Sequence, residues 1–473
     1  MIAIVVSRAD SASEHIGERL LAVGDWERRE DPNRPDAEGG GTYYRTDGFE
    51  LREFDGLHIE LDDPAVAFGG GDADGDDVNG DGSADGGGDA DGDRTDLDFL
   101  VFVSRHAGES GELLTAHVTG NFGPSPYGGE PRTLSNAAPG AEKRVVEALA
   151  AHAPAGYDVG IECTHHGPTN VSVPSLFVEL GSDEAQWADS DAAEAVARAV
   201  LDLRGTGADL VGDDAARHVV GFGGGHYAPR FDRILTETDW GVGHVAADWA
   251  LEEMGDADES RAVVAKAFQA SGTEFAVVDG GSPELESVVD ELGFETLSET
   301  FLRETTGVPL DLVGRLETEL RPVDEGLRFG VGAGEADADG VVTRELPTEL
   351  LEAANGVDRE AVLEALDRTA VAYTTEEGAT LVAGRVALRE EGDYRAVVDG
   401  LAAVLEAKYD TVEVRTSSVI ARREAFDPDR AEALGVEPGP AFGRLSAGEA
   451  IEVDGERIDP ADVRSARERT FPL

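Results

Sequence analysis

The sequence predicts an α/β fold, with a mixed, largely parallel sheet flanked by helices, followed by an appended α+β domain. Apolar, β-branched runs alternate with helical patterns up to about residue 305, which is typical of parallel strands joined by crossover helices. No histidine follows His244, so the two parts of the chain differ in composition. A 41% hydrophobic content over 473 residues suffices for the cores of about two or three domains.

The elements of the first part follow from their residue patterns. Ile2 to Ser7 is a β-branched run, and Asp10 or Ser11 can cap the helical pattern that comes next. Residues 42–61 are interpreted as two strands joined by a turn at Asp55-Gly56. Further strands are expected at 97–103, 113–118, 157–162, 175–180, 218–222 and 274–278. Helices are expected at 139–151, 183–203, 260–270 and 283–292, and the stretch 230–254 is expected to be mostly helical.

The chain regains periodicity after about Thr305, where we expect a separate domain over residues 306–473. Helices are predicted at 347–354, 359–366 and 394–408. The first of them opens with Pro347, and proline is favoured at the first position of a helix. Residues 1–305 then form the catalytic domain, because all the histidines lie there.

Residues 69–96 consist mostly of Gly and Asp and interrupt the first domain. The run from Asp72 to Asp77 superficially resembles a calcium loop, but no Glu stands where the bidentate twelfth ligand would be. Because Gly and Asp bury no apolar surface, we predict a disordered insertion rather than a calcium site.

The net charge is −59, from 39 Lys and Arg against 98 Asp and Glu spread over periodic segments. Such a surface keeps a folded protein soluble in concentrated salt, so a halophilic protein is expected. The Debye length is about 3 Å in molar salt, so this acidity does not exclude a nucleic-acid partner held by a local arginine pocket. No run approaches the roughly 20 apolar residues of a membrane span, and no signal-peptide pattern opens the chain, so a cytoplasmic protein is expected.

Two histidine-bearing strings are the strongest candidates for chemistry. Both place imidazoles beside Gly and Pro, where backbone can approach a substrate. Imidazole is a general base near pH 7 and a common metal ligand, so we expect His165, His166 and His226 to be catalytic. Glu162 would orient an imidazole or act as a base itself. The strings are Glu162-Cys163-Thr164-His165-His166-Gly167-Pro168-Thr169 and Gly221-Phe222-Gly223-Gly224-Gly225-His226-Tyr227-Ala228-Pro229-Arg230.

Other polar residues near strand ends are candidate metal ligands, delivered from separate loops. No His-x-x-x-His or His-x-His spacing marks a local zinc site. One of the candidates, His117, could equally be a hydrogen-bonded core histidine, and another, His244, could cap or pack a helix. Surface positions are expected for His58 and His152. The candidate ligands are His106, His117, His244 and Glu179.

The substrate-binding candidates flank the same strings. Arg105 and Arg230 could bind phosphate, because a guanidinium makes bidentate bonds to it. The run Gly223-Gly224-Gly225 lacks the dinucleotide-binding pattern, and its amides are expected to stabilise an oxyanion. Tyr227, beside His226, is grouped with these residues. Cys163 has no cysteine-hydrolase signature around it, so an inert thiol is favoured over a nucleophile.

Four separated strings carry a family resemblance over about residues 1–305. They are Ser104-Arg105-His106 with Gly108-Glu109-Ser110-Gly111, then Thr119-Gly120-Asn121-Phe122-Gly123, Glu162 to Pro168, and Gly221 to Arg230. In this order they resemble the archaeal-type D-aminoacyl-tRNA deacylase family. The resemblance implies hydrolysis of the ester joining a D-amino acid to the tRNA 3′ end, which is translation quality control. It also implies Zn²⁺ as cofactor and a core similar to peptidyl-tRNA hydrolase and phosphorylase-like folds. The Gly/Asp insertion and the residues after 305 depart from the compact family form.

The appended domain has one suggestive string, from Gly435 to Leu445. It is similar to a Pro-Gly-Pro-x-Phe-Gly-x-Leu segment of the tRNA 3′-processing nuclease RNase Z. Its Phe442 and Arg444 could stack on and pair with RNA, or the string could be only a rigid turn.

Two alternative functions stay open beside the deacylase. One is a metal-dependent amidase or ester hydrolase acting on small molecules. The other is a non-catalytic tRNA-binding protein, which leaves the clustering of histidines unexplained. The expected partner is tRNA, bound by a monomer that has no membrane association.

Overall fold

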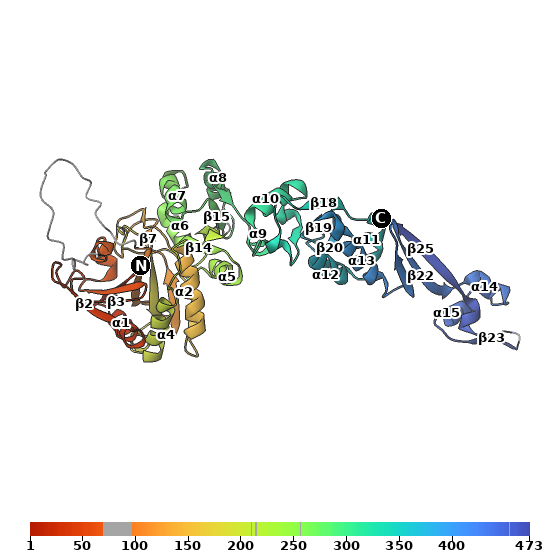
Figure 1. Cartoon of the computed structure of the whole chain (residues 1–473), viewed down its shortest axis with the longest axis horizontal. Coiled ribbons are helices and arrows are strands. Elements are labelled where there is room, and N and C mark those ends of the chain that lie inside the picture. The colour runs from red at the N-terminus through yellow and green to blue at the C-terminus, as the bar shows by residue number, and fades with distance from the viewer. Residues whose placement is uncertain (70–96, 210, 213–214, 256, 454) are drawn as a thin grey trace, which may run out of the picture. The chain divides into compact units, whose positions relative to one another are not determined.

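The computed structural model describes residues 1–69, 97–209, 211–212, 215–255, 257–453 and 455–473 (Figure 1). These residues form two compact units, Met1–Thr306 and Gly307–Leu473, and the division lies next to the boundary expected at 305. The predicted Gly/Asp insertion falls outside the described residues, apart from Gly69. Within the described ranges, no helix is long and apolar enough to cross a membrane.

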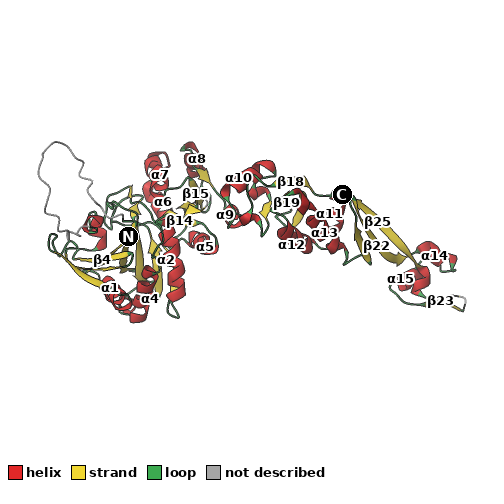
Figure 2. Ribbon diagram, in the orientation of Figure 1, coloured by secondary structure: helices red, strands yellow, loops and turns green. Residues whose placement is uncertain are grey.

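The first unit contains an eight-stranded mixed sheet, which confirms the predicted fold class (Figure 2). Its strands are β1 (Ile2–Ser7), β2 (Glu27–Asp31), β3 (Gly41–Thr46), β4 (Phe49–Phe54), β5 (Phe99–Arg105), β6 (Leu113–His117), β9 (Asp158–Ile161) and β10 (Ser175–Gly181). The strand order is β2-β3-β4-β1-β5-β10-β6-β9. The four central strands from β4 to β10 are parallel, β10 is antiparallel to β6, and β6 is parallel to β9.

The predicted strand pair at 42–61 is present, but its turn lies elsewhere. β3 and β4 pair antiparallel around Asp47-Gly48, and residues after β4 form the short 3-10 helix η1 (His58–Glu60). Asp47-Gly48 and Asp55-Gly56 are equally suited to a hairpin turn. The parallel pairing of β4 with β1 decides between them, and this pairing is not visible in the local sequence.

Helices cover one face of this sheet and loops cover the other. α1 (Ser11–Val23), α4 (Ser190–Leu201) and α2 (Pro139–His152) pack together on the helical side. α1 begins where the Asp10 carboxylate accepts two backbone N–H groups, as predicted for a cap. The helix expected over 183–203 is instead split into α3 (Glu184–Trp187) and α4, because Asp189 caps a new start. On the other face, residues including Val5, Phe102 and Phe177 form a core with the segments near 65–68 and 171.

A second, four-stranded parallel sheet completes the first unit, in the order β14-β13-β15-β16. The loop after β9 joins the two sheets, since Cys163 N–H donates to His226 O and Thr164 N–H donates to Val245 O. The strands are β13 (His218–Phe222), β14 (Gly241–Ala246), β15 (Phe275–Val278) and β16 (Glu295–Thr296), with short pairs β7 (Gly120–Asn121), β8 (Thr133–Leu134), β11 (Val211–Gly212) and β12 (Ala215–Ala216). The helices are α5 (Pro229–Glu237), α6 (Asp248–Met254), α7 (Ala257–Ser271), α8 (Pro283–Glu291) and α9 (Glu299–Glu304).

The second unit has its own sheets and an apolar core against α11, α12 and α13, the three helices that the periodicity predicts. Its helices are α10 (Leu310–Glu319), α11 (Thr348–Asn355), α12 (Arg359–Thr369), α13 (Tyr394–Leu405), α14 (Pro428–Ala433) and α15 (Pro440–Ser446). Its strands are β17 (Leu327–Phe329), β18 (Val342–Glu345), β19 (Ala372–Glu376), β20 (Leu381–Leu388), β21 (Thr411–Val414), β22 (Ser418–Phe426), β23 (Ile451–Val453), β24 (Glu456–Ile458) and β25 (Arg464–Pro472).

The Gly435–Leu445 string does not present Phe442 and Arg444 on a loop. Pro440 begins α15, and the Phe442 ring packs edge-on against Phe426 with 5.1 Å between ring centroids. Arg444 Nε donates to Glu449 at 3.1 Å. Phe442, which could have stacked on RNA, therefore packs against a small core, and Arg444, which could have paired with RNA, is neutralised by Glu449.

Candidate functional site

Two buried glutamates stand at the centre of the histidine cluster. Glu162 follows β9 and Glu179 lies on β10, and neither side chain is exposed by more than 4%. His106 Nδ1 lies 2.9 Å from Glu162 Oε1 and 3.5 Å from Glu179 Oε2. The Thr115 hydroxyl donates to Glu162 Oε1 at 2.5 Å. These partners compensate the cost of burying two carboxylates in one place.

Close packing of the backbone makes room for His106. A Cβ atom at Gly181, the last residue of β10, would lie only 2.7 Å from His106 Cβ. Real side chains do not approach so closely, so a glycine is required here for the His106 ring to reach the two carboxylates.

Part of the cluster lies over the loop-covered face of the large sheet. Because β10 is antiparallel to β6, Glu179 stands opposite Thr115, and Phe177 stands opposite His117. Cross-strand partners share a face, so these four side chains project together. The His117 ring stacks on Phe177 with 5.2 Å between centroids. The expected location outside the carboxyl ends of the strands is therefore only part of the arrangement.

Three imidazoles, those of His117, His165 and His166, converge above Glu179, and one ring nitrogen of each lies within 4.8 Å of the others. His165 Nδ1 lies 2.8 Å from Cys163 O, and His166 Nδ1 lies 2.7 Å from Gly167 O. His117 Nδ1 lies 3.1 Å from Val118 O. Each Nδ1 therefore donates to a backbone carbonyl and leaves a lone pair on Nε2 in the neutral ring. Burial would lower the pKa of His117, but its contact with Glu179 raises it, which favours the protonated form of this ring. The buried Nε2 of His117 has no hydrogen-bond partner among the described residues.

His226 brings the second sheet into the cluster. Its Nε2 lies 2.8 Å from Glu162 Oε2, and its Nδ1 lies 3.5 Å from Cys163 Sγ. The order carboxylate, imidazole and thiol is that of a catalytic triad. Cys163 is nevertheless fully buried and lines neither of the two cavities described below. A substrate cannot reach such a thiol, in agreement with the inert interpretation.

The two glutamates are held in the ionised form. Burial alone would raise the pKa of Glu162, but hydrogen bonds from His106 and His226 hold it well below its ordinary value. Burial would also raise the pKa of Glu179, which His106 and His117 lower to about 2. In turn, burial would lower the pKa of His106, but its bonds to both carboxylates raise it to about 11.

The histidines differ in charge although they touch. Burial, together with neighbouring histidines, lowers the pKa of His165 well below its ordinary value and that of His166 to about 4. Hydrogen bonds with Cys163 and Glu162 raise the pKa of His226 to about 9. Near pH 7 a neutral His165 and a protonated His226 therefore lie side by side, with 4.7 Å between ring centroids. Groups whose pKa values are pushed apart are suited to acid and base roles.

Two cavities open on the cluster and share Tyr127, His165 and His226 as a common wall. An ester placed at this wall would have space for one substituent on each side. The first cavity, of 430 Å³, is lined on its polar side by Asp10, Ser104, Arg105, His106, His166 and Glu179. The second, of 330 Å³, is walled mainly by Phe122, Pro124, Pro126, Trp249 and Ala250.

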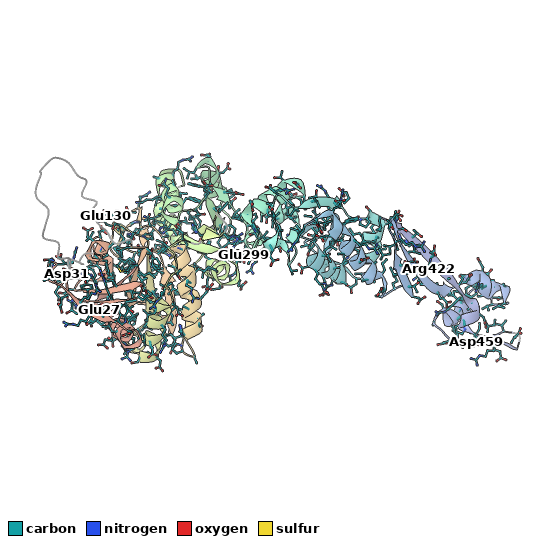
Figure 3. The ribbon with its side chains drawn as sticks, viewed as in Figure 1. Glu27, Asp31, Glu130, Glu299, Arg422 and Asp459 are labelled. Carbon is teal, nitrogen blue, oxygen red and sulfur yellow. The ribbon has the colours of Figure 1, made fainter. Side chains whose placement is uncertain are left out.

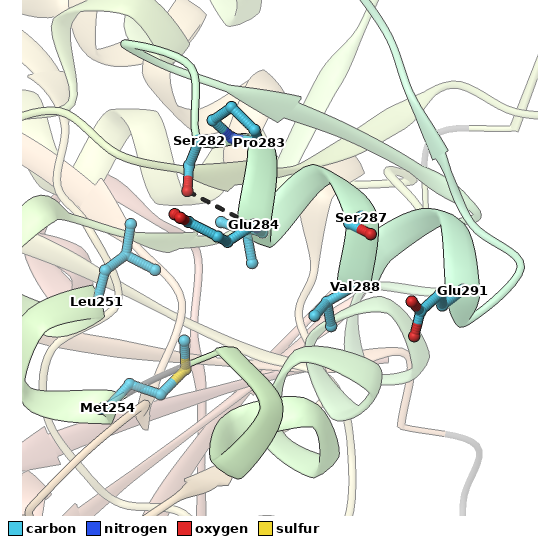
Figure 4. A pocket seen from close by; sticks show the side chains of 10 residues that line it. Leu251, Met254, Ser282, Pro283, Glu284, Ser287, Val288 and Glu291 are labelled. Carbon is cyan, nitrogen blue, oxygen red and sulfur yellow. Dashed lines mark hydrogen bonds between the residues drawn. The ribbon is translucent and has the colours of Figure 1, made fainter.

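A larger cavity, of 860 Å³, lies between α6 and α8 (Figure 4). Its ionisable lining residues are Glu284 and Glu291, and no imidazole lines it within the described part of the chain. Ser282, at its rim, caps α8 by accepting the Leu285 N–H. This cavity has space but no set of groups for acid–base or nucleophilic chemistry, so the histidine cluster is the candidate site.

The glycine run next to His226 does not offer the expected oxyanion site. Gly223 N–H donates to Ala246 O, and Gly224 N–H donates to Asp248 Oδ1 at 3.0 Å. Both amides are therefore already used. Gly223 has a φ of +97°, and a Cβ there would lie 2.5 Å from Asp279 O, so the run serves a tight turn. Gly225 lines neither cavity that borders the cluster.

The two arginines expected to bind phosphate lie in different surroundings. Arg230 lies 2.9 Å from Asp279 and 3.1 Å from Glu299, which is labelled in Figure 3. Both carboxylates neutralise it, and it lines neither cavity. Arg105 lines the first cavity, and its guanidinium lies 5.3 Å from the centre of the Trp187 ring. Only Arg105 is thus placed to meet a ligand.

The predicted ligand His244 lies outside the cluster. Its Nε2 lies 2.8 Å from Ser135 O and its Nδ1 lies 3.1 Å from Thr164 Oγ1, so both ring nitrogens are used in the core. Packing, the alternative considered for this residue, is what the structure shows. Tyr227, in contrast, reaches the cluster, since its hydroxyl lies 3.2 Å from His106 Nε2 and donates to Ser110.

Sequence reasoning missed several residues of the site. His58 was expected at the surface but is 2% exposed and packs edge-on against Phe102 and Phe177 beside the first cavity. Asp10, which caps α1, also lines that cavity. The position of Asp10 after a buried parallel strand could have indicated a site residue. Nothing local marks His58, because its burial depends on two distant strands.

Comparison with known proteins identifies the family. The family model of D-aminoacyl-tRNA deacylase matches residues 93–297, which contain every histidine and glutamate of the cluster. Over its whole length the chain is 62% identical to the D-aminoacyl-tRNA deacylase of Halorubrum lacusprofundi and covers 97% of that protein. The chain belongs to the D-aminoacyl-tRNA deacylase family.

Similar proteins match the chain over different spans. The D-aminoacyl-tRNA deacylase of Natronomonas pharaonis is 59% identical, with 100% of both chains covered, so this relative spans the second unit too. A solved structure, described as a conserved protein of unknown function, is 28% identical with a TM-score of 0.52. That match covers 98% of the solved chain but 65% of this one.

Proposed function

We propose that the chain hydrolyses the ester bond between a D-amino acid and the 3′ end of tRNA, releasing the free D-amino acid and tRNA. The observation that carries the proposal is the contact between His165 and His226 at the wall shared by the two cavities. Membership of the deacylase family supports the choice of substrate. The ester would lie at the shared wall, with the aminoacyl group on one side and the terminal nucleoside on the other.

The protonation states of the groups in the cluster suit this hydrolysis. Water adds to the ester carbonyl and passes one proton to the ionised Glu179 carboxylate, which lines the first cavity. The bond from the carbonyl carbon to the ribose oxygen then breaks, and the ribose oxygen takes up the proton that His226 donates. His226 carries a proton near neutral pH and lines both cavities. Glu162 holds its Nε2, and its Nδ1 makes a 3.5 Å contact with Cys163 Sγ that the ribose oxygen of the bound ester would replace. We assign to His226 the donation of this proton and to Glu162 the orientation of its ring.

We further propose Zn²⁺ as the cofactor, held by the Nε2 atoms of His117, His165 and His166. The anchored Nδ1 atoms and the unpartnered Nε2 of His117 support this set, since ligand histidines usually donate the other ring N–H to a carbonyl or carboxylate. Glu179 Oε1 lies 3.7 Å from His117 Nε2 and 3.9 Å from His166 Nε2, close enough to orient or complete the set. When bound, zinc polarises a carbonyl and lowers the pKa of a water molecule.

Zinc content can be measured independently of activity. Elemental analysis of wild type, His166→Ala and the control His152→Ala should give bound zinc in the first and last only. His152 is a suitable control because it contacts Asp202 away from the cluster. Full activity after complete removal of zinc by a chelator would refute the cofactor proposal.

The activity itself is tested with matched D- and L-tyrosyl-tRNA in concentrated KCl. Release of tyrosine from the D-ester alone is the expected result. Cleavage of small esters or amides without cleavage of the tRNA ester would favour the small-molecule hydrolase. Binding of tRNA without turnover of either ester would favour a non-catalytic protein.

The proposal also covers the oligomeric state, the location in the cell and the adaptation to salt. We propose a monomer, because one chain supplies every residue of the cluster. A cytoplasmic location follows from the tRNA substrate. Adaptation to concentrated salt is supported by the net charge of −59 and by the similarity to proteins of Halorubrum and Natronomonas.

A further inference from the structure

Most arginines of the second unit have an acidic partner. Those in ion pairs are Arg315, Arg344, Arg359, Arg368, Arg385, Arg389, Arg395, Arg415, Arg422, Arg430, Arg444 and Arg457. Arg321 and Arg328 donate to backbone carbonyls. Four arginines show neither kind of side-chain partner among the described residues, and all lie on β22 or β25: Arg423, Arg464, Arg467 and Arg469.

Three of these four share one face of the pair formed by β22 and β25, two strands that are labelled in Figure 1. Arg423 stands directly opposite Arg467, and Ala421 stands opposite Arg469. Because side chains alternate along a strand, Arg423, Arg467 and Arg469 project to the same side, while Arg464 projects to the other. We call Arg423, Arg467 and Arg469 the arginine face. Like charges directly opposite each other destabilise a strand pair.

The arginine face lies between two apolar cores. Val419, Ala421 and Phe471 belong to the core that α11, α12 and α13 cover. At the other end of the strands, Phe426 packs against the small core of α14 and α15. Arg467 and Arg469, between these ends, are exposed. Apolar burial thus explains both ends of the strand pair but not the cationic middle.

Two aromatic rings orient the arginine face. The Arg469 guanidinium lies 4.8 Å from the centre of the Phe471 ring, and that of Arg423 lies 5.8 Å from the Tyr409 ring. Such contacts hold a guanidinium without neutralising it. In a chain with 98 acidic and 39 basic residues, three neighbouring arginines with no ion pair among the described residues form a local patch of positive charge.

We infer that the arginine face binds the phosphate backbone of RNA, at a part of the tRNA substrate other than its ester. The identity of the RNA as tRNA rests on the proposed function. A guanidinium makes bidentate bonds to phosphate, and a row of them suits a chain of repeated phosphates. The Debye length is about 3 Å at 1 M salt, so in concentrated salt the interaction depends on direct contact and not on long-range attraction.

The test replaces the arginine face and measures affinity for tRNA. The variant Arg423→Ser/Arg467→Ser/Arg469→Ser is compared with Arg359→Ser/Arg368→Ser/Arg444→Ser, which removes the same charge from ion-paired arginines of the same unit. Fluorescence anisotropy with labelled tRNA that carries no amino acid, measured over a KCl series, gives Kd and its salt dependence. We expect the first variant to bind about 10-fold more weakly with a shallower salt slope, and the control to match wild type.

Kinetics separate this surface from the reaction site. The serine variant of the arginine face should have a higher KM for D-tyrosyl-tRNA and an unchanged kcat. Its KM and kcat for a D-tyrosylated minihelix that lacks the tRNA body should equal those of wild type. The variant Arg423→Lys/Arg467→Lys/Arg469→Lys keeps the charge and should retain most of the affinity, which controls for folding.

Several results would overturn the inference. These are an unchanged Kd and salt slope in the serine variant, an equal loss in the control, or competition by polyglutamate as effective as by RNA, which would point to an acidic protein instead. Wild type that binds tRNA through the arginine face but cleaves no D-ester would refute the proposed function alone. Normal D-ester cleavage with an unchanged KM in the serine variant would refute the arginine face alone.

Discussion

Glu162 Oε2 lies 2.8 Å from His226 Nε2, and this contact connects the two sheets of the first unit. Glu162 follows β9 of the large sheet, and His226 follows β13 of the small one. The same carboxylate also holds His106, so one buried group orients two imidazoles from different strands. This relationship determines what substitutions at the site should do.

Glu162→Gln should lower turnover by about 10²-fold or more, because a neutral amide cannot hold both imidazolium rings in place. Removing one partner of a buried ionic network also destabilises a protein, by about 3 kcal/mol. The measurement is the single-turnover rate per folded molecule, with the folded fraction from circular dichroism. Glu194→Gln, at the surface of α4, is the matched control. A normal rate in folded Glu162→Gln would remove this residue from the mechanism.

His226→Ala should also lower the single-turnover rate by about 10²-fold or more, with tRNA affinity largely kept, because general acid catalysis contributes a factor of that size. His152→Ala should leave the rate unchanged. If His226 only packs its loop, the thermal midpoint falls while the rate per folded molecule stays the same, and the assigned role is then wrong.

Cys163→Ala should retain most of the activity, because the buried thiol borders neither cavity. Thiol-alkylating reagents should likewise leave the native enzyme active. Measuring both the alkylation stoichiometry and the remaining rate makes the test quantitative. Complete loss of turnover in a well-folded Cys163→Ala protein, with a covalent aminoacyl intermediate trapped in wild type, would show that the triad geometry is used after all.

Gly181→Ala should damage activity through His106, since the new Cβ would meet His106 Cβ at 2.7 Å. Overpacking of this kind typically costs about 1–3 kcal/mol and displaces the neighbouring ring. Gly314→Ala is a suitable control, because a Cβ there meets nothing within 4 Å. Thermal midpoint and single-turnover rate are measured for both. Equal behaviour of the two variants would contradict the importance of this close approach.

His244 should make stability depend on pH. Burial lowers its folded-state pKa to about 4, while an unfolded histidine titrates near its ordinary 6.5. As the pH falls, the unfolded chain therefore binds this proton at a higher pH than the folded chain does. The stabilisation that the neutral, buried His244 contributes is complete above pH 6.5 and is lost as the pH falls towards 4, by up to about 3 kcal/mol. Urea unfolding at constant KCl and several pH values should show this decline, and His244→Asn should flatten it. Parallel curves for the two proteins would argue against a neutral buried His244.

The sequence predicts the residues of the site better than their partners. His106, Glu162 and His226 follow apolar runs, so their place after strands is visible locally. The pairing of Glu179 with His106 is not visible in the sequence. It depends on β10 lying between β5 and β6, parallel to the first and antiparallel to the second. Arg230 is misjudged for the same reason, since its partner Glu299 is 69 residues away.

The turns of the large sheet also depend on pairing between distant strands, which the local sequence does not show. Asp47-Gly48 and Asp55-Gly56 have identical local chemistry, and only the pairing of β4 with β1 selects the first as the turn. Local propensity therefore locates most helices and strands, whereas long-range pairing decides which turn, face or ring nitrogen is used.

The loop after β9 is hydrogen-bonded to the small sheet through Cys163 and Thr164, while Glu162 just before it belongs to the large one. During synthesis the ribosome delivers His106, His117, His165 and His166 well before His226. A shortened chain that ends before β13 would hold most of the imidazoles but would lack His226, the proposed proton donor that Glu162 holds. The proposed role of His226 therefore implies that ester cleavage requires the two sheets to have docked, and that fragments which fold early do not cleave aminoacyl-tRNA.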